Sequence, residues 1–117
     1  MPSRSRILAA VALLTAVPVA AAQPAAAPKG NVVAGKKVFV ASCGSCHTLK
    51  AAATVARSKR RGPSLDRYRL SFSKVFRQLF EGGDTMPAFA DKLTATQLRD
   101  VAAFVEQATK TYAKSGY

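Results

Sequence analysis

Tryptophan is missing from the sequence, and the residues that most often hold metals or cofactors are scarce: one histidine, two cysteines and two methionines among 117 residues. Two cysteines and one histidine supply only three of the four ligands of a structural zinc site, so such a site is disfavoured. Acidic residues are also few, with six against 18 lysines and arginines and a formal net charge of +12. Any chemistry must therefore come from a small number of side chains on a strongly basic chain.

Residues 1–22 have the composition of a secretory signal peptide. Two positive charges, Arg4 and Arg6, precede an apolar run over residues 7–17, and small residues close the segment. This order of charged, apolar and small residues is typical of an exported precursor that is cleaved. The alternative is a retained anchor, but the run is shorter than the roughly 20 residues of a spanning helix, and Pro18 interrupts its end. We therefore predict a periplasmic or otherwise extracytoplasmic protein.

The rest of the chain divides into a linker and one domain. Residues 23–30 are rich in alanine and proline without a helical or strand period, and residues 31–114 form the expected domain. No other stretch is apolar enough to span a membrane. A domain this small buries only about 60 to 70% of its unfolded surface, so an embedded apolar cofactor would supply much of the missing core.

Three helical patterns separate in the domain, and no segment alternates like a strand. The first covers residues 32–42 and contains Gly35, which is costly in a helix and indicates close approach of another backbone or ring. The second covers residues 72–81 and ends at Gly82 and Gly83. Its side chains at helical spacing predict a core-facing stripe: Phe72, Val75, Phe76, Leu79 and Phe80.

The third helix has the clearest start. Thr94 at the N-cap and Gln97 three residues later form a capping box, in which each side chain binds the other's backbone N–H. An apolar stripe follows, made of Leu98, Val101, Ala102, Phe104 and Val105. The domain is therefore expected to be small, all-α and rich in loops.

Both cysteines and the only histidine lie together in Cys43-Gly44-Ser45-Cys46-His47. Cys-x-x-Cys-His is the attachment signature of c-type haem. The thiols of Cys43 and Cys46 add to the two vinyl groups along one edge of the porphyrin, and His47 is then held beneath the ring as the proximal iron ligand. We predict one covalently bound haem c.

Other readings of the cysteine pair are weaker. A redox pair of the thioredoxin kind would follow a strand in a βαβ unit, and the sequence has no such pattern. Export would favour a disulfide, but cysteines separated by two residues close too small a loop to staple a domain.

Met86 is the candidate sixth ligand. His47 is the only histidine, and Met1 leaves with the signal peptide, so Met86 in GGDTMPAF is the remaining soft ligand. Pro87 biases Met86 towards an extended conformation. A thioether ligand stabilises ferrous iron and raises the potential. The alternative role for Met86 is a core residue that fills a gap.

Together these motifs resemble class I cytochrome c, the small single-haem electron carriers of bacterial periplasm and respiratory chains. The resemblance runs from GKKVFVASCGSCHTL through GPSL and MPAF to LRDVAAFVEQA. It implies a small all-α cytochrome c fold with three or more helices wrapped around one covalently bound haem. It also implies that Gly35 and Phe39 cross the last helix near Val101 and Phe104.

The resemblance assigns two further positions in GPSL. The carbonyl of Pro63 would accept a hydrogen bond from His47 and thereby fix the Nδ1–H tautomer. Leu65 would pack on the haem, as would Phe89 after the axial methionine. The expected cofactor-binding residues are therefore Cys43, Cys46, His47, Pro63, Leu65 and Met86, with His47 and Met86 on the metal.

The chain departs from the family in two respects. The segment TLKAAATVARSKRR after the histidine is unusually basic and carries no family motif. Without tryptophan, a haem propionate would need Tyr68, Arg67 or Arg69 as its partner, although an ordinary exposed loop explains these three residues as well.

Positive charge is densest in what we call the basic cluster, Arg57, Lys59, Arg60 and Arg61. Such a field raises encounter rates with an acidic partner and makes them fall with salt. Redox proteins with acidic docking surfaces are the expected partners, and anionic membrane surfaces are a possible second contact. Export argues against nucleic acid, and a solvated loop that only aids solubility is the simpler alternative.

The sequence is thus interpreted as that of a monomeric one-electron carrier with no catalytic residues of its own. Two alternatives remain: a haem c subunit of a larger oxidoreductase, and a haem protein that reacts with gas or peroxide after Met86 leaves the iron. The lack of a second histidine to act as acid and base disfavours peroxide chemistry.

Overall fold

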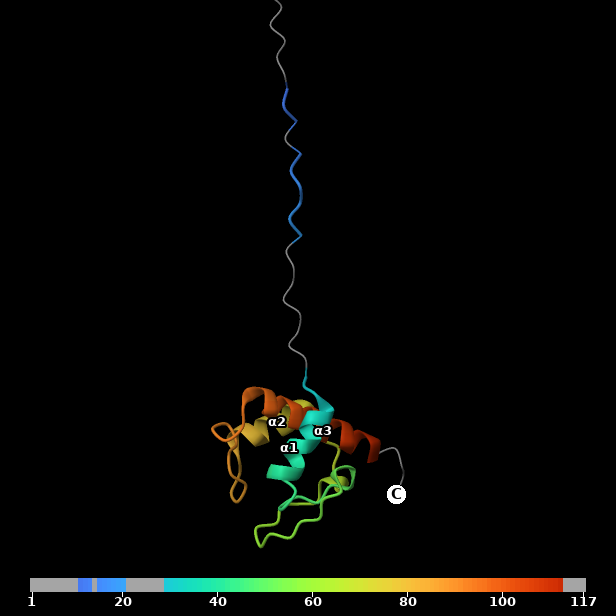
Figure 1. Cartoon of the computed structure of the whole chain (residues 1–117), viewed down its shortest axis with the longest axis vertical. Coiled ribbons are helices and arrows are strands. Elements are labelled where there is room, and N and C mark those ends of the chain that lie inside the picture. The colour runs from blue at the N-terminus through green and yellow to red at the C-terminus, as the bar shows by residue number, and fades with distance from the viewer. Residues whose placement is uncertain (1–10, 14, 21–28, 113–117) are drawn as a thin grey trace, which may run out of the picture.

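The computed structural model describes residues 11–13, 15–20 and 29–112 (Figure 1). Three α-helices and two short 3₁₀ turns make up the domain, and no strand occurs within these ranges. In chain order they are α1 (Val32–Ser42), η1 (Lys50–Ala52), η2 (Leu65–Arg67), α2 (Phe72–Glu81) and α3 (Ala95–Tyr112). An isolated antiparallel bridge joins Leu49 and Thr54. The all-α fold and the bounds predicted for the first two helices are confirmed.

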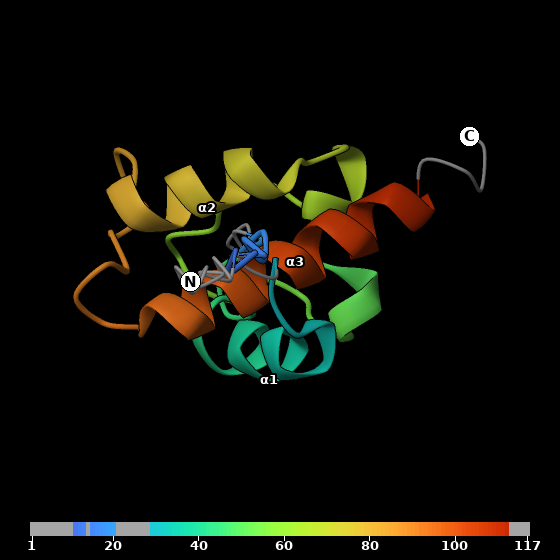
Figure 2. The same ribbon diagram turned by 90° about the horizontal axis from the view of Figure 1, so that it is seen from above.

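Helix α3 is the scaffold of the domain, because both other helices pack on it. Seen from above, α1 and α2 lie on opposite sides of α3 (Figure 2). The buried face of α3 runs through successive turns and includes Leu98, Val101, Ala102, Phe104, Val105 and Ala108. Its start has the expected capping box, since Thr94 N–H donates to Gln97 Oε1 at 2.9 Å and Gln97 N–H donates to Thr94 Oγ1 at 3.1 Å.

Helix α1 crosses α3 at Gly35. A Cβ at this position would overlap the carbonyl of Asp100, so only glycine allows the two backbones to approach so closely. One turn later, the rings of Phe39 and Phe104 meet edge to face with centroids 5.7 Å apart. Asn31 caps α1 through its side chain, and its N–H donates to the buried carboxylate of Asp100 at 2.7 Å. The predicted crossing is confirmed, with Asp100 as an additional contact.

Helix α2 buries a narrower face than its sequence predicts. Val75 and Leu79 are buried, whereas Phe80 is 53% exposed. The rings of Phe72, Phe76 and Phe80 stack along the helix, with successive centroids 5.9 and 6.4 Å apart. Placing Phe80 in the core was therefore wrong, because only the first two rings of this row, Phe72 and Phe76, pack against the core.

The N-terminal predictions fall largely outside the described ranges. Residues 11–13 and 15–20 of the predicted signal peptide belong to no helix or strand, and its other residues, residues 23–28 of the linker and residues 113–114 of the domain are not described. Among the residues that the structure does describe, no helix is long and apolar enough to cross a membrane.

Candidate functional site

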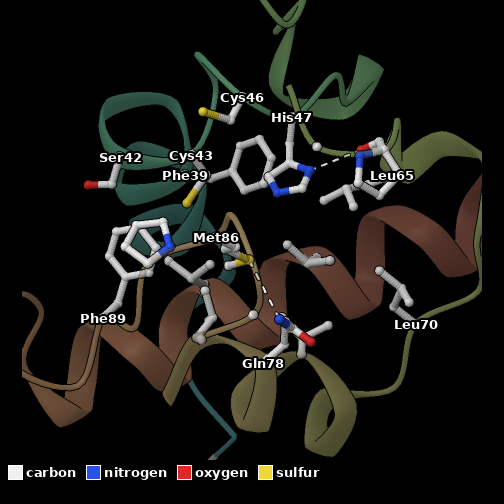
Figure 3. Close-up of a pocket in the computed structure, with 18 of the residues that line it drawn as sticks. Phe39, Ser42, Cys43, Cys46, His47, Leu65, Leu70, Gln78, Met86 and Phe89 are labelled. Carbon is white, nitrogen blue, oxygen red and sulfur yellow. Dashed lines mark hydrogen bonds between the residues drawn. The ribbon is translucent and has the colours of Figure 1, made fainter. Parts of the chain in front are cut away.

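A cavity of about 530 Å³ lies between the end of α1, the inner face of α2, α3 and the connecting loops (Figure 3). Its apolar wall comes from every part of the domain and is formed by Phe39, Leu65, Leu70, Val75, Leu79, Phe89, Val101 and Val105. Cys43, Cys46, His47, Pro63 and Met86 line the same space. The structure thus brings all six predicted site residues to one cavity.

The cysteines lie on a tight turn that continues α1. Cys43 is the C-cap of the helix, and its N–H donates to the carbonyl of Phe39 at 2.8 Å. The carbonyl of Cys43 accepts from the N–H of Cys46 at 3.1 Å and from that of His47 at 2.9 Å. Both thiols are free and border the cavity. The turn therefore fixes two sulfurs and one imidazole in a single rigid unit.

Cys43 is the more buried of the two thiols, with 6% of its surface exposed. Loss of hydration, with a smaller contribution from Cys46, raises the pKa of Cys43 to about 11. Burial disfavours the thiolate because a charge is costly in an apolar surrounding. The unattached thiol is accordingly neutral at physiological pH.

The ring of His47 is held by the segment Gly62-Pro63. Its Nδ1 lies 2.9 Å from the carbonyl oxygen of Pro63, and because a carbonyl can only accept, Nδ1 carries the proton. A Cβ at the neighbouring Gly62 would overlap the ring, so glycine allows the loop to approach the imidazole this closely. The Nε2 lone pair is left as the available donor atom.

Residues 54–65, which include the basic cluster, fold back onto the attachment turn. The carbonyl of Ser45 accepts from the N–H groups of Arg57 and Ser58, both at 3.0 Å, and the carbonyl of Cys46 accepts from Gly62 at 2.9 Å. The hydroxyl of Thr54 donates to the carbonyl of His47 at 3.0 Å. The side chains of the basic cluster are therefore exposed, while the segment that carries them is anchored mainly through backbone N–H groups.

Met86 approaches the cavity from the loop between α2 and α3. The loop turns sharply at Gly82, whose φ of +74° is one that glycine adopts without strain. The N–H of Gly83 donates to the carbonyl of Met86 at 2.9 Å and closes the turn. In Figure 3 the sulfur of Met86 and the ring of His47 point into the same space from different segments of the chain.

The polar rim of the cavity includes one of the three residues considered as partners of a haem propionate. Tyr68 borders the space, whereas Arg67 and Arg69, both in the described part of the chain, do not. Arg60, Lys74 and Gln78 are additional polar lining residues. Lys74 and Gln78 were not predicted because they are ordinary exposed positions on α2. The one available signal was their position in the sequence next to Val75 and Leu79, which face the cavity.

The donor set and shape fit one haem c. Two thiols at Cys-x-x-Cys spacing, an imidazole with a free Nε2 and a thioether border an apolar cavity of about 530 Å³. Within the described ranges, no group of three or more His, Cys, Asp or Glu side chains could hold a bare metal ion. The residues present therefore suit a flat apolar group attached at the two cysteines rather than a metal bound by protein ligands alone.

Comparison with known proteins points the same way. Residues 30–105 match the family described as cytochrome C oxidase, cbb3-type, subunit III. The chain is 34% identical over 90 residues to a cytochrome c6 of Thermosynechococcus vestitus, covering 75% of this chain and 80% of the relative. It is also 34% identical over 102 residues to a cytochrome c6 of a Nostoc species, covering 86% and 87%.

A solved structure shares the fold. The crystal structure of the c-type cytochrome SorU from Sinorhizobium meliloti superposes with a TM-score of 0.59 and 28% sequence identity, covering 67% of this chain and 90% of that one.

Proposed function

The chain belongs to the cytochrome c family, with one haem c attached at Cys43 and Cys46, and on that premise we propose that it is a one-electron carrier with His47 and Met86 as axial ligands. The observation that carries the proposal is that His47 and Met86, 39 residues apart in the sequence, direct their donor atoms into the same apolar cavity beside both cysteines. A carrier needs no catalytic side chain of its own.

Bound haem c would supply an iron that gains or loses one electron. The chain's own residues hold and tune this group. Cys43 and Cys46 anchor one edge, and Pro63 keeps the proton of His47 on Nδ1, so that Nε2 faces the cavity. Met86 provides a soft sulfur that favours the reduced state. The apolar wall, including Leu65, excludes water and so limits the reorganisation that follows a change in charge.

The proposed location is outside the cytoplasmic membrane. The same proposal divides the chain into a signal peptide (residues 1–22), a linker (residues 23–30) and the carrier domain (residues 31–114). Its support is the charged, apolar and small-residue order of the N-terminal segment, together with the need to load haem c in an exported compartment. Absorption spectra of periplasmic and membrane fractions, with mass spectrometry of the N-terminus, would test it.

The proposed partner is a redox protein with an acidic docking surface. Arg57, Lys59, Arg60 and Arg61 are all exposed, and Arg60 also borders the cavity. Positive charge is therefore placed next to the site through which an electron would pass. Complementary charge accelerates encounter and makes the rate fall with ionic strength.

A second candidate is a subunit of a larger oxidoreductase, favoured by the family match to an oxidase subunit. Gel filtration at native expression level separates the two. A free carrier elutes as a single haem-stained monomer, whereas a subunit copurifies with a partner in fixed ratio.

Optical spectra test the central proposal. The exported protein should keep its haem through acid-acetone extraction, show the long-wavelength Met-to-iron band when oxidised and fail to bind CO when reduced. Covalent haem without that band, with ready CO binding, would instead support a gas-reactive or peroxide-reactive protein.

A further inference from the structure

Lys29 and Gly30 hold the chain against α3 immediately before α1 begins. Gly30 has a φ of +137°, and a Cβ there would overlap the carbonyl of Arg99, so its backbone lies directly on α3. The ammonium of Lys29 lies 3.4 Å from the carboxylate of Glu106 and 6.0 Å from the centre of the Phe72 ring. Two successive residues therefore fix the point at which the preceding chain enters the domain.

This entry point lies on the side of α3 that faces away from the cavity. Val101 and Val105 line the cavity, whereas Ala103 and Gln107 border a second depression together with the entry point. Each residue of the second pair follows one of the first by two positions, which places it about 160° round the helix. In Figure 1 the start of the domain accordingly lies at its top and the loop of the basic cluster at its bottom.

The side of α2 and α3 that faces away from the cavity, which we call the outer face, carries an exposed aromatic ring. Phe80 follows the cavity-lining Gln78 by two positions, so it lies about 160° round α2 from that residue. Its side chain is 53% exposed and stacks on the ring of Phe76. Arg77 and Glu81, which flank Phe80 on α2, carry opposite charges. The outer face therefore presents an aromatic edge without a net charge from α2.

Positive charge on the outer face comes from α3 and the entry point. Lys110 borders the second depression, and Arg99 lies one turn before Ala103 on the same side of the helix. With Lys29 these cations outnumber the one carboxylate on this side of α3 among the described residues, that of Glu106. An exposed phenylalanine beside an excess of lysine and arginine is typical of surfaces that lie in the headgroup region of anionic bilayers.

We propose that the outer face docks on an anionic membrane surface, with the ring of Phe80 below the headgroups and Lys29, Arg99 and Lys110 at the lipid phosphates. The entry point supports this orientation. The apolar run of residues 7–17 precedes it, so a chain that still carries this segment is tethered to the bilayer on the same side. The basic cluster then faces away from the membrane and stays open to a redox partner. The proposal does not depend on how the iron is ligated.

Contact through the basic cluster is the competing arrangement, because positive charge is densest there. Attraction between charges alone is screened by salt, so binding through the basic cluster would disappear at high ionic strength. Binding through the outer face would weaken but persist, because burial of an aromatic ring is not screened. Salt dependence and the identity of the protected residues therefore distinguish the two faces.

Sedimentation of the exported holoprotein with vesicles of phosphatidylglycerol or of phosphatidylcholine tests the proposal. The wild type should bind phosphatidylglycerol only. Phe80→Ser should weaken binding about five- to tenfold, because roughly half of a phenylalanine side chain would lose its burial. Arg99→Gln combined with Lys110→Gln should weaken it roughly tenfold, because each cation close to an anionic surface adds to the attraction.

Matched controls lie on the other side of the domain. Val55→Ser removes an exposed apolar side chain from the segment of the basic cluster, where Val55 is 65% exposed. Arg60→Gln combined with Arg61→Gln removes the same charge as the double variant on α3. Both controls should bind phosphatidylglycerol vesicles within about twofold of the wild type, since neither changes the outer face.

Acetylation of lysines, read by mass spectrometry with and without vesicles, locates the contact in the wild-type protein. Lys29 and Lys110 are exposed and should become protected when phosphatidylglycerol vesicles are added, while Lys59 in the basic cluster should stay reactive. This measurement needs no substitution, so it decides even where a variant fails to load haem.

Three results would overturn the proposal. The first is a wild type that does not bind phosphatidylglycerol vesicles. The second is protection of Lys59 in place of Lys29 and Lys110, or a larger loss of binding in the control variants, which would assign the lipid contact to the basic cluster. The third is a concentration-dependent dimer in sedimentation velocity that Phe80→Ser abolishes, because a second copy would then cover the outer face.

Discussion

Nδ1 of His47 lies 2.9 Å from the carbonyl oxygen of Pro63, a residue 16 positions later in the chain. This contact joins the attachment turn to the loop that follows it and fixes the tautomer of the single histidine. Gly62 packs against the same ring, so the segment Gly62-Pro63 forms one wall of the imidazole site.

Gly62→Ala should displace the imidazole of His47. The added Cβ would overlap the ring, and overpacking of this type costs about 1 to 3 kcal/mol. We expect less haem-loaded protein and an altered axial-ligand spectrum. Pro63→Ala is the control, because it keeps the backbone carbonyl and should keep the spectrum; equal loading and identical spectra for both variants would contradict the assigned contact.

Met86→Leu should remove the sixth ligand while keeping an apolar side chain of similar size. The oxidised protein should lose the Met-to-iron band, and the reduced protein should bind CO rapidly, because one axial position opens. Stopped-flow CO binding and absorption spectra measure both effects. Phe89→Leu changes the cavity wall without touching a sulfur and should retain the band.

Gly35→Ala should destabilise the domain through the α1 and α3 crossing. Its Cβ would overlap the carbonyl of Asp100, and since backbone cannot rotate away, a loss of about 1 to 3 kcal/mol in unfolding free energy is expected. Val33→Ala, at a position 69% exposed, should change stability by less than about 0.5 kcal/mol. Denaturant unfolding measures both variants. If the crossing mattered little, Gly35→Ala would be at least as stable as Val33→Ala.

Glu106→Gln should reduce stability at neutral pH but not in acid. A hydrogen bond from Lys110, aided by the N–H of Phe72 and the charge of Lys29, lowers the pKa of Glu106. A carboxylate with a depressed pKa stabilises the fold above its unfolded value of about 4.3, and the contribution disappears as pH falls through the folded pKa.

Thermal unfolding as a function of pH would measure this. The gap between wild type and Glu106→Gln should amount to about 1 kcal/mol or less at pH 7, because Lys29 and Lys110 are largely exposed, and should close below the folded pKa. A gap that stays constant down to acid pH would assign the effect to packing instead of charge.

Reversing charge in the basic cluster should slow electron transfer to an acidic partner. Arg60→Glu combined with Arg61→Glu should lower the second-order rate at low ionic strength and flatten its salt dependence, because long-range attraction is screened by salt. Lys36→Glu with Lys37→Glu on α1 changes net charge equally and is the matched control. Identical rates and salt slopes for the two double variants would reject docking at this cluster.

Much of the fold was predictable because local signals and packing agree. The capping box at Thr94 and the apolar stripe behind it defined α3, and Gly35 indicated a close helix crossing before its partner was known. Phe80 was misplaced because a periodic stripe gives the width of an apolar face but not how much of it a neighbouring helix covers. Asp100 and Thr109 were missed because a buried polar residue looks like a surface residue until its partner is known.

The ligands of the site could be predicted because each is of a residue type that is rare in this sequence. With one histidine and one methionine in the domain, composition alone pointed to His47 and Met86 as candidates. The contact of Gln78 with Met86 could not be predicted, because glutamine is common on exposed helix faces and its amide acquires these partners only through the turn at Gly82. The fold of residues 54–65 could not be predicted either, since most of its anchoring hydrogen bonds come from backbone N–H groups, which do not depend on the residue type.

The packing of α1 against α3 predicts how the protein behaves when its chain is cleaved between these helices. The N–H of Asn31 and the carboxylate of Asp100 are joined across 69 residues, so a break in the basic cluster leaves the first and last helices still complementary. One fragment would carry both cysteines and His47, and the other Met86 with α2 and α3. Mixed together, the two pieces should reassociate through the Gly35 crossing, and each half would contribute one face of the divided site.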